Sequence, residues 1–164
     1  MACSTATRTG TGTYAPVNGL KMYYETHGSG RPMILLHGGL ASGEMFGPIL
    51  ETLSAERRVI VPDLQGHGRT ADIDRPIDMR LMADDIAALI DQLGLDRPDV
   101  VGYSLGGGVA FHTAVRHPDR VGKLVMASAH IRRDAIPAEM LTDFAQFPPP
   151  AVPLVEDEVN DREH

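Results

Sequence analysis

The stretch at residues 100–109 constrains the fold of this chain more than any other part of its sequence. It reads Val-Val-Gly-Tyr-Ser-Leu-Gly-Gly-Gly-Val, so two branched apolar residues precede a Gly-x-Ser-x-Gly pattern and a glycine-rich run follows. This order predicts a buried strand, a sharp turn at Ser104 and a helix that begins at Leu105. Such a turn strains the serine backbone and holds the hydroxyl clear of the sheet. We therefore predict that Ser104 is a nucleophile.

Two other short apolar runs also end in glycine or polar residues. Residues 33–36 lead into His37-Gly38-Gly39, and residues 58–61 lead into Pro62-Asp63 and a polar loop. Continuous apolar runs of this length are typical of strands buried on both faces. Helices are predicted at residues 45–53, 79–93 and 105–117. This alternation of strand and helix predicts an α/β fold, with a mostly parallel sheet covered by helices on both faces.

Asn18-Gly19 separates two strand-like runs, at residues 13–17 and 20–26. The dipeptide is the preferred centre of a two-residue type I′ turn, so an N-terminal antiparallel hairpin is predicted. A last strand is predicted at residues 121–127. Binding sites in open parallel sheets form at the carboxyl ends of the strands. We expect His37, Asp63, Ser104 and residues 128–130 to share that edge.

Composition excludes several classes of function. The chain has 164 residues, long enough for one domain with a sizeable core, and its net charge of −7 argues against nucleic-acid or anionic-membrane partners. Its single cysteine, Cys3, cannot form an intramolecular disulfide, and no apolar run reaches membrane-spanning length. We predict a cytoplasmic protein. The sequence has no phosphate-binding P-loop, dinucleotide fingerprint or metal-ligand spacing, so we expect no cofactor or metal.

Three motifs, taken in order, resemble those of the α/β-hydrolase family, and most of all its cofactor-free esterase, lactonase and haloperoxidase-like branch. They are His37-Gly38-Gly39, Asp63-Leu64-Gln65-Gly66-His67-Gly68-Arg69-Thr70 and Gly102-Tyr103-Ser104-Leu105-Gly106-Gly107. The resemblance runs from about residue 14 to about residue 147. It implies an α/β-hydrolase core whose substrate is a small acyl compound.

The resemblance also implies roles for individual residues. Ser104 matches the nucleophile, and the backbone N–H of Leu105 matches one donor of the oxyanion hole. The N–H of Gly39 is implied as the second donor, with Leu40 as the alternative. Dehalogenase and epoxide-hydrolase relatives carry aspartate where this chain has Ser104, and the serine favours acyl chemistry.

Three histidine- or carboxylate-bearing positions match structural parts of the family. His37 resembles the histidine that braces a loop, and Asp63 and His67 match a motif that is mainly structural. His117 ends the helix after Ser104, where a cation suits the helix dipole. None of these positions is the expected catalytic base.

A serine nucleophile needs a base and an acid that orients it, and in this family both follow the serine. Residues after 121 predict one strand and no recognisable acid–histidine pair. We therefore expect a chain truncated at its C-terminal side, lacking the last strands, with weak or no activity. A rewired relay is one alternative, in which His130 acts with Asp134 or Glu139, or, as a weaker pair, His67 acts with Asp63.

The other alternative is a non-catalytic binding or self-assembling module. A sheet that ends at residues 121–127 exposes an apolar edge, which a second copy of the chain would cover as a homo-oligomer. In either case the predicted domain organisation is the same. Residues 1–12 form a disordered segment, residues 13–135 an incomplete hydrolase core, and residues 136–164 the start of a cap and an acidic tail.

Overall fold

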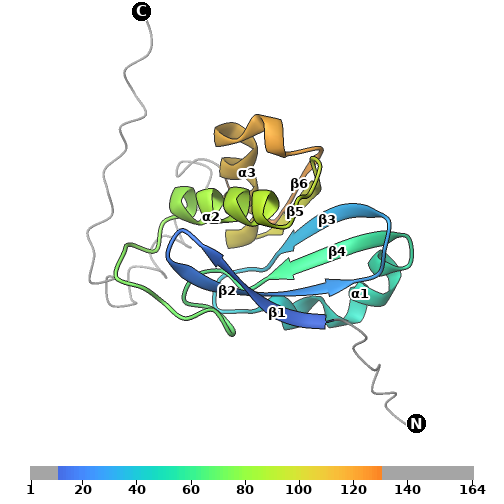
Figure 1. Ribbon diagram of the computed structural model, residues 1–164, viewed down its shortest axis with the longest axis horizontal. Coiled ribbons are helices and arrows are strands. Elements are labelled where there is room, and N and C mark those ends of the chain that lie inside the picture. Colours follow the sequence, from blue (N-terminus) through green and yellow to red (C-terminus); the bar gives the residue numbers. More distant parts are fainter. Residues whose placement is uncertain (1–10, 131–164) are drawn as a thin grey trace, which may run out of the picture. The chain divides into compact units, whose positions relative to one another are not determined.

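A computed structural model describes residues 11–130 of the protein (Figure 1). Within them, six strands form one sheet in the order β1-β2-β4-β3-β5-β6. The strands are β1 Thr11–Val17, β2 Leu20–His27, β3 Arg31–Leu36, β4 Arg57–Pro62, β5 Asp99–Tyr103 and β6 Leu124–Ala127. The helices are α1 Gly47–Ser54, α2 Met79–Gln92 and α3 Leu105–Arg116, with 3-10 turns η1 Gly43–Phe46 and η2 Pro118–Arg120.

The N-terminal hairpin turns at Asn18 and Gly19, as the sequence predicts. Their φ angles are 46° and 87°, the left-handed conformations that a type I′ turn needs at both central positions. Strand β2 then joins the rest of the sheet by pairing antiparallel with β4. The hairpin therefore forms one end of the sheet.

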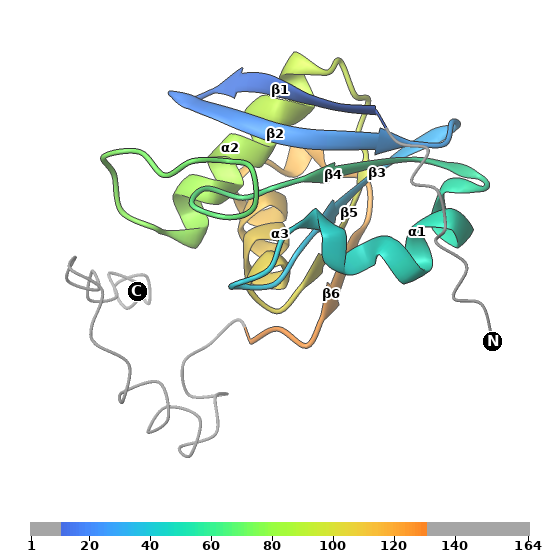
Figure 2. The same ribbon diagram turned by 90° about the horizontal axis from the view of Figure 1, so that it is seen from below.

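The other strands, β3 to β6, are parallel to one another. Figure 2 shows them lying side by side. Because parallel strands point the same way, their carboxyl ends meet along one edge of the sheet and their amino ends along the other. The predicted fold class is confirmed: a mostly parallel sheet with an N-terminal antiparallel hairpin and helices on both faces.

Helices α2 and α3 lie on one face of the sheet and α1 on the other (Figure 1), and each face carries its own core. Helices α2 and α3 cover the larger core, which includes Ile34, Ile60, Ile86, Leu89, Val100 and Val109. Helix α1 covers a smaller one, made of Leu35, Phe46, Leu50, Val59 and Val61. Successive residues such as Ile34 and Leu35 point to opposite faces, as the pleat of a strand requires. This burial on both faces explains why these strands are continuous apolar runs.

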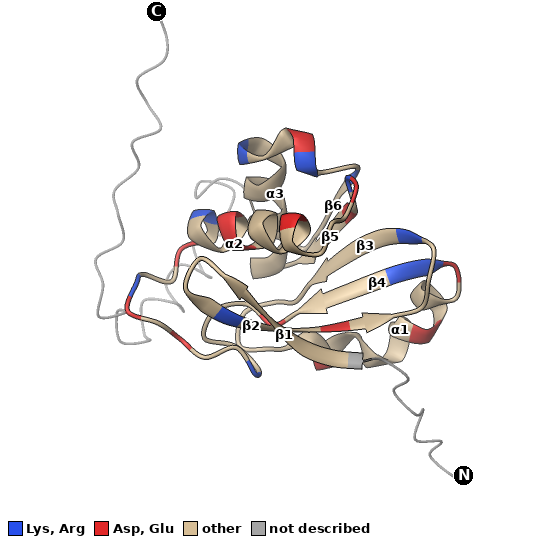
Figure 3. Cartoon of the chain, in the orientation of Figure 1, with Lys and Arg blue, Asp and Glu red and all other residues tan. Residues whose placement is uncertain are grey.

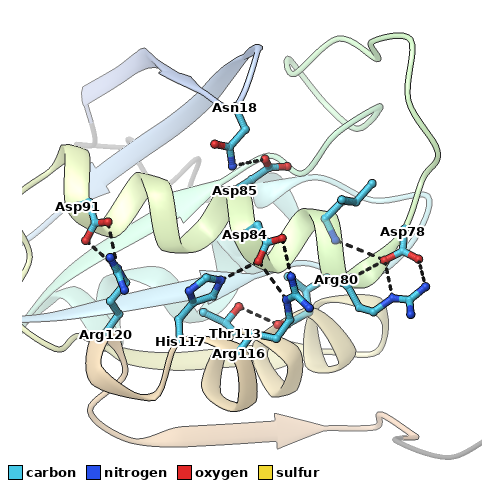
Figure 4. A network of polar contacts seen from close by, with 12 residues as sticks. Asn18, Asp78, Arg80, Asp84, Asp85, Asp91, Thr113, Arg116, His117 and Arg120 are labelled. Carbon is cyan, nitrogen blue, oxygen red and sulfur yellow. Dashed lines mark hydrogen bonds and ion pairs between the residues drawn. The ribbon is translucent and has the colours of Figure 1, made fainter. Parts of the chain in front are cut away.

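Polar contacts join α2 to α3 and so hold the helix that follows Ser104 (Figure 4). Asp84 on α2 accepts hydrogen bonds from Arg116 at 2.9 Å and His117 at 2.7 Å, both at the C-terminal end of α3. The Arg116 guanidinium lowers the pKa of the Asp84 carboxyl. Asp78 caps α2, and its side chain accepts the N–H of Arg80 at 2.6 Å.

Two elements differ from their predicted form. The helix predicted at residues 45–53 is divided into η1 and α1, because the Ser42 hydroxyl accepts the N–H of Glu44 at 3.3 Å and caps a 3-10 turn first. Strand β6 begins at Leu124 and not at residue 121. The N–H of Gly122 bonds to the carbonyl of Pro98 at 2.9 Å, outside the strand ladder.

Parts of the predicted domain organisation lie outside the described residues. These parts are the cap and tail at residues 136–164 and most of the N-terminal segment at residues 1–12. The boundary at residue 135 therefore stays a prediction. Across residues 11–130, none of the helices has both the length and the apolar character needed to cross a bilayer.

Candidate active site

Ser104 occupies the tight turn between β5 and α3, in a conformation that few side chains adopt. Its φ and ψ are 51° and −117°. Glycines on both sides make the turn sterically possible. A Cβ on Gly102 would lie 2.0 Å from the carbonyl oxygen of Gly106, and one on Gly106 would lie 2.4 Å from that of Leu36. Strand, turn and helix therefore pack as closely as the Gly-x-Ser-x-Gly pattern predicts.

The backbone of Ser104 is fixed, while its side chain faces solvent. Its N–H donates to the carbonyl of Ala127 at 2.9 Å, and its carbonyl accepts the N–H of Gly107 at 2.9 Å. Ser104 itself is exposed. Within residues 11–130, the hydroxyl makes no hydrogen bond to another side chain. The geometry thus presents an accessible hydroxyl on a rigid support.

The loop after β3 passes beside this hydroxyl and brings the predicted oxyanion donors together. A Cβ built on Gly38 would lie 3.5 Å from Cβ of Ser104, and one on Gly39 would lie 3.8 Å from Cβ of Leu105. Leu105 is the first residue of α3, so its N–H has no partner within the helix. Neither that N–H nor that of Gly39 donates to a protein acceptor in the described part of the chain.

Leu40, the alternative donor, lies on the outside of the same loop. It has a φ of 59° and its side chain is fully exposed at 101 %. A bulky residue in the left-handed region is strained, and here the strain falls directly after the two glycines. The structure therefore brings Gly39, Ser104 and Leu105 into one place and leaves the Leu40 side chain in solvent.

His37 supports the loop after β3 through hydrogen bonds, as the resemblance implies. Its Nε2 accepts the N–H of Leu64 at 3.0 Å, so the proton must reside on Nδ1, which donates to the carbonyl of Gly38 at 2.8 Å. The ring is fully buried. Burial lowers the pKa of the imidazole below its ordinary value, which keeps His37 neutral. The neutral ring links the loops that follow β3 and β4.

Asp63 supports the same loops with both of its carboxylate oxygens. Oδ1 accepts the N–H of Gly43 at 2.8 Å and Oδ2 accepts that of Arg69 at 2.9 Å. The side chain is buried, and a Cβ on Gly68 would lie 2.2 Å from Oδ2. Both carboxylate oxygens of Asp63 are therefore engaged in hydrogen bonds with backbone N–H groups.

His67 is also held by the backbone. Its Nδ1 donates to the carbonyl of Gln65 at 2.8 Å, and its ring centroid lies 5.2 Å from that of His37. No hydrogen bond joins His67 to Asp63 in residues 11–130. The weaker alternative relay, in which these two act as a pair, is therefore not formed.

The other candidate base, His130, follows β6 on the same edge as Ser104 and is exposed. Its predicted partners, Asp134 and Glu139, lie outside the described residues. The structure brings His130 to the correct edge, since β5 and β6 are parallel neighbours. It makes no hydrogen bond between His130 and Ser104.

Two methionines near the site, Met45 and Met79, are not among the site residues predicted from the sequence. Met45 is 40 % exposed, and its sulfur accepts the N–H of Gly38 at 3.5 Å. Met79 is 39 % exposed, and its sulfur lies 2.4 Å from where a Cβ on Gly108 would be. Both therefore form part of the exposed carboxyl side of the sheet. Nothing in their sequence spacing distinguishes them from core methionines.

Comparison with known proteins identifies the scaffold. The family model described as "alpha/beta hydrolase fold" matches residues 31–158. The chain belongs to the α/β-hydrolase family.

Curated relatives have hydrolase names of more than one kind. A protein of Caulobacter sp. (strain K31), provisionally named carbamate hydrolase RutD, is 40 % identical over 118 residues, which are 69 % of this chain and 44 % of that protein. The soluble epoxide hydrolase of Corynebacterium sp. (strain C12) is 40 % identical over 113 residues, 67 % of this chain and 38 % of that protein. The chain thus spans less than half the length of these relatives.

A solved structure agrees on the fold. The ligand-free epoxide hydrolase CorEH aligns with 84 % of this chain and 50 % of its own, with a TM-score of 0.77 and 33 % identity. The expectation that this chain lacks part of the family fold is consistent with that coverage.

Proposed function

We propose that this chain carries the nucleophile and oxyanion donors of a serine hydrolase that acts on carboxylic esters or related acyl substrates. The observation that carries the proposal is the exposed hydroxyl of Ser104, beside two backbone N–H groups that have no acceptor among residues 11–130. Those donors belong to Leu105 and Gly39. Together they fit the charge that develops on a carbonyl oxygen under attack.

The reaction that fits this arrangement is acyl transfer through a covalent intermediate. The Ser104 oxygen bonds to the carbonyl carbon while a base takes the hydroxyl proton, and the carbonyl oxygen becomes an oxyanion between the two N–H groups. The carbon–oxygen bond to the alcohol then breaks, and the alcohol leaves with a proton. Water repeats the sequence on the acyl-serine, which releases the carboxylic acid and restores Ser104.

The identity of the nucleophile argues for acyl substrates over epoxides, although relatives named epoxide hydrolases match the chain. A serine that opened an epoxide would form an ether. An ether has no carbonyl carbon for water to attack, so the enzyme would not turn over by this route. An ester or a carbamate gives an acyl-serine that water can hydrolyse, and one relative is named for carbamate hydrolysis.

Turnover also requires a base, and Ser104 has no histidine partner among residues 11–130. We therefore propose that this chain reacts with activated acyl compounds but turns over weakly or not at all. Removal of a relay member still leaves catalysis over water of about 10³-fold from the oxyanion hole and binding. We further propose a cytoplasmic location, on the basis of the single cysteine, Cys3.

Stoichiometric labelling with a fluorophosphonate probe tests the proposal. The intact mass should rise by one adduct, which peptide mapping should place on Ser104. The Ser104→Ala variant should lose the adduct. Ser128→Ala is the matched control, because Ser128 also follows a parallel strand and also has a positive φ, of 52°. Equal labelling of Ser104→Ala and the parent chain would overturn the proposal.

The same assay addresses the relay. If His130 is the base, His130→Ala should slow labelling strongly, and release of p-nitrophenol from p-nitrophenyl acetate should fall with it. If labelling and release are unchanged in His130→Ala, the rewired relay is excluded and the chain acts without an internal base at that position.

Self-association is a second candidate function, favoured by one observation. In the described sheet, β6 is an edge strand, and its Leu124 and Val125 are 36 % and 51 % exposed. An edge with exposed apolar side chains favours pairing with another strand. We propose that a second copy covers this edge. Molar mass should then rise with concentration for the parent chain and stay monomeric for Val125→Lys. A concentration-independent monomer would contradict it.

A further inference from the structure

A hollow of about 660 Å³ lies at the amino edge of the parallel strands, remote from Ser104. Its charged lining consists of Arg31, Arg58, Asp96, Arg97 and Lys123. These residues sit at the start of β3 and β4 and in the turns before β5 and β6. Ser104 lies beyond the other end of β5, about 17 Å along the chain from Asp99. The hollow is therefore separate from the candidate active site.

The positive charges of this edge are only partly neutralised. Asp99 accepts Arg31 at 3.0 Å and Arg57 at 2.6 Å, and it is 4 % exposed. In the described part of the chain, no carboxylate forms an ion pair with Arg58 or Lys123. Figure 3 shows blue ribbon where β3 and β4 begin. A chain with a net charge of −7 therefore keeps an unneutralised group of cations here.

Backbone conformation and a glycine position these cations around the hollow. Arg97 has a left-handed φ of 42°, and its Nε and Nη2 donate to the carbonyl of Val121 at 3.3 and 3.2 Å. A Cβ on Gly122 would lie 3.0 Å from Oδ1 of Asp99 and 3.3 Å from Nη2 of Arg31. The missing side chain at Gly122 leaves the guanidinium of Arg31 accessible. The carbonyl of Val121 holds the guanidinium of Arg97 in place.

We propose that this hollow binds a small anion that carries two phosphate-type groups. Arginine presents several donors in a plane that matches phosphate oxygens, and lysine adds a compact point charge. Cations outnumber the single carboxylate, Asp96, in this lining, and a concave site with an excess of one sign of charge concentrates oppositely charged ligands. The volume lies in the range of small-molecule sites and exceeds what a single phosphate fills. Cations on several loops can contact both ends of a diphosphate.

Lysine modification tests the proposal, because the chain has only two lysines, Lys123 and Lys21. Lys21 is the second residue of β2, and the pairing of Tyr24 with Pro62 places it toward the carboxyl edge. The rate of acetylation of each lysine is measured by peptide mass spectrometry in two parallel reactions. One contains inorganic pyrophosphate, and the control contains sodium chloride at the same ionic strength. Pyrophosphate should slow modification of Lys123 at least about threefold and leave Lys21 unchanged. Equal slowing at both lysines, or at neither, would overturn the proposal.

Charge-removing variants give a second readout that does not depend on lysine chemistry. Pyrophosphate affinity measured by calorimetry should fall about tenfold in an Arg58→Gln/Lys123→Gln double variant and stay within about twofold in Lys21→Gln. Arg58 and Lys123 form no ion pairs in the described chain, so this variant should unfold at the temperature of the parent. Unchanged affinity in the double variant would contradict the site.

Discussion

The two edges of the parallel sheet use the same strands for different chemistry. At the carboxyl edge, the positions beside Ser104 are glycines, a neutral buried histidine and backbone N–H groups. At the amino edge, arginines and a lysine surround the buried Asp99. One edge is defined by backbone conformation, and the other by side-chain charge. Substitutions that alter shape should therefore damage the first edge, and substitutions that alter charge the second.

The largest effect should come from Gly106→Ala at the carboxyl edge. The added Cβ would lie 2.4 Å from the carbonyl oxygen of Leu36 and 2.5 Å from that of His37, and backbone atoms have little room to move. We expect a loss of about 3 kcal/mol or more in the free energy of unfolding, measured by urea titration.

Gly39→Ala is the control for that substitution, because its Cβ would be 3.8 Å from the nearest atoms of Leu105. It should change the free energy of unfolding by about 0.5 kcal/mol or less. If both variants lose the same amount, close packing at the turn is not what makes the carboxyl edge sensitive.

Asp63→Asn should cost about 2 kcal/mol, because one amide nitrogen would replace an oxygen that now accepts a backbone N–H. The variant should also slow fluorophosphonate labelling of Ser104, since Asp63 holds the loop that continues from Gly39 through Gly43. Asp72→Asn is a matched control on an exposed residue, whose Oδ1 accepts Gln65 at 2.7 Å. Equal labelling rates in the two variants would contradict the supporting role of Asp63.

Acidity should weaken the carboxyl edge through His37. Burial lowers the pKa of its imidazole in the native state, so the unfolded chain binds the proton more readily. The stabilising contribution is therefore complete above the unfolded pKa of about 6.5 and is lost as the pH falls toward the lower native pKa. We expect the free energy of unfolding to decrease between about pH 7.5 and pH 5.5.

His37→Gln separates this contribution, because glutamine can accept the N–H of Leu64 and does not titrate. The pH dependence should be shallower in the variant. His112, whose pKa is also lowered by burial, accounts for a remaining part. An identical slope in parent and variant would show that His37 is not the titrating group.

The smallest effects should distinguish two neighbouring arginines at the amino edge. Arg57→Gln removes a partner of the buried Asp99 and should cost about 1 kcal/mol. Arg58→Gln breaks no ion pair to a residue of the described chain and should cost about 0.3 kcal/mol or less by chemical denaturation. An equal loss in both would mean that the cations lining the hollow are structural.

The sequence predicts those features whose causes are local. Asn18-Gly19 specifies its turn within two residues, and Asp78 caps the helix that follows it. The glycines around Ser104 indicate that the backbone there is too closely packed for a side chain. The parallel direction of β3 to β6 follows from the alternation of strands and helices. The fold class and the tight turn at Ser104 can therefore be predicted without coordinates.

Features that join distant residues cannot be predicted in the same way. Asp99 meets Arg31 and Arg57 across separations of 68 and 42 residues, and nothing in their sequence neighbourhoods marks them as partners. The contact of Met45 with Gly38 depends on the path of η1, which the sequence suggests as part of one longer helix. The catalytic roles of Ser104, Leu105 and Gly39 remain predictions until their chemistry is measured.

The strand order also bears on how the chain folds as it is synthesised. The hairpin of β1 and β2 reaches the sheet only through β4, which is made about 30 residues later. At about 5–20 residues per second, that interval is about 2–6 s. Leu20 and Met22 are almost fully buried in the folded chain. During this interval of synthesis, the core against which they pack has not yet formed. We expect a ribosome-bound intermediate at this length to be a preferred client of chaperones that bind apolar segments.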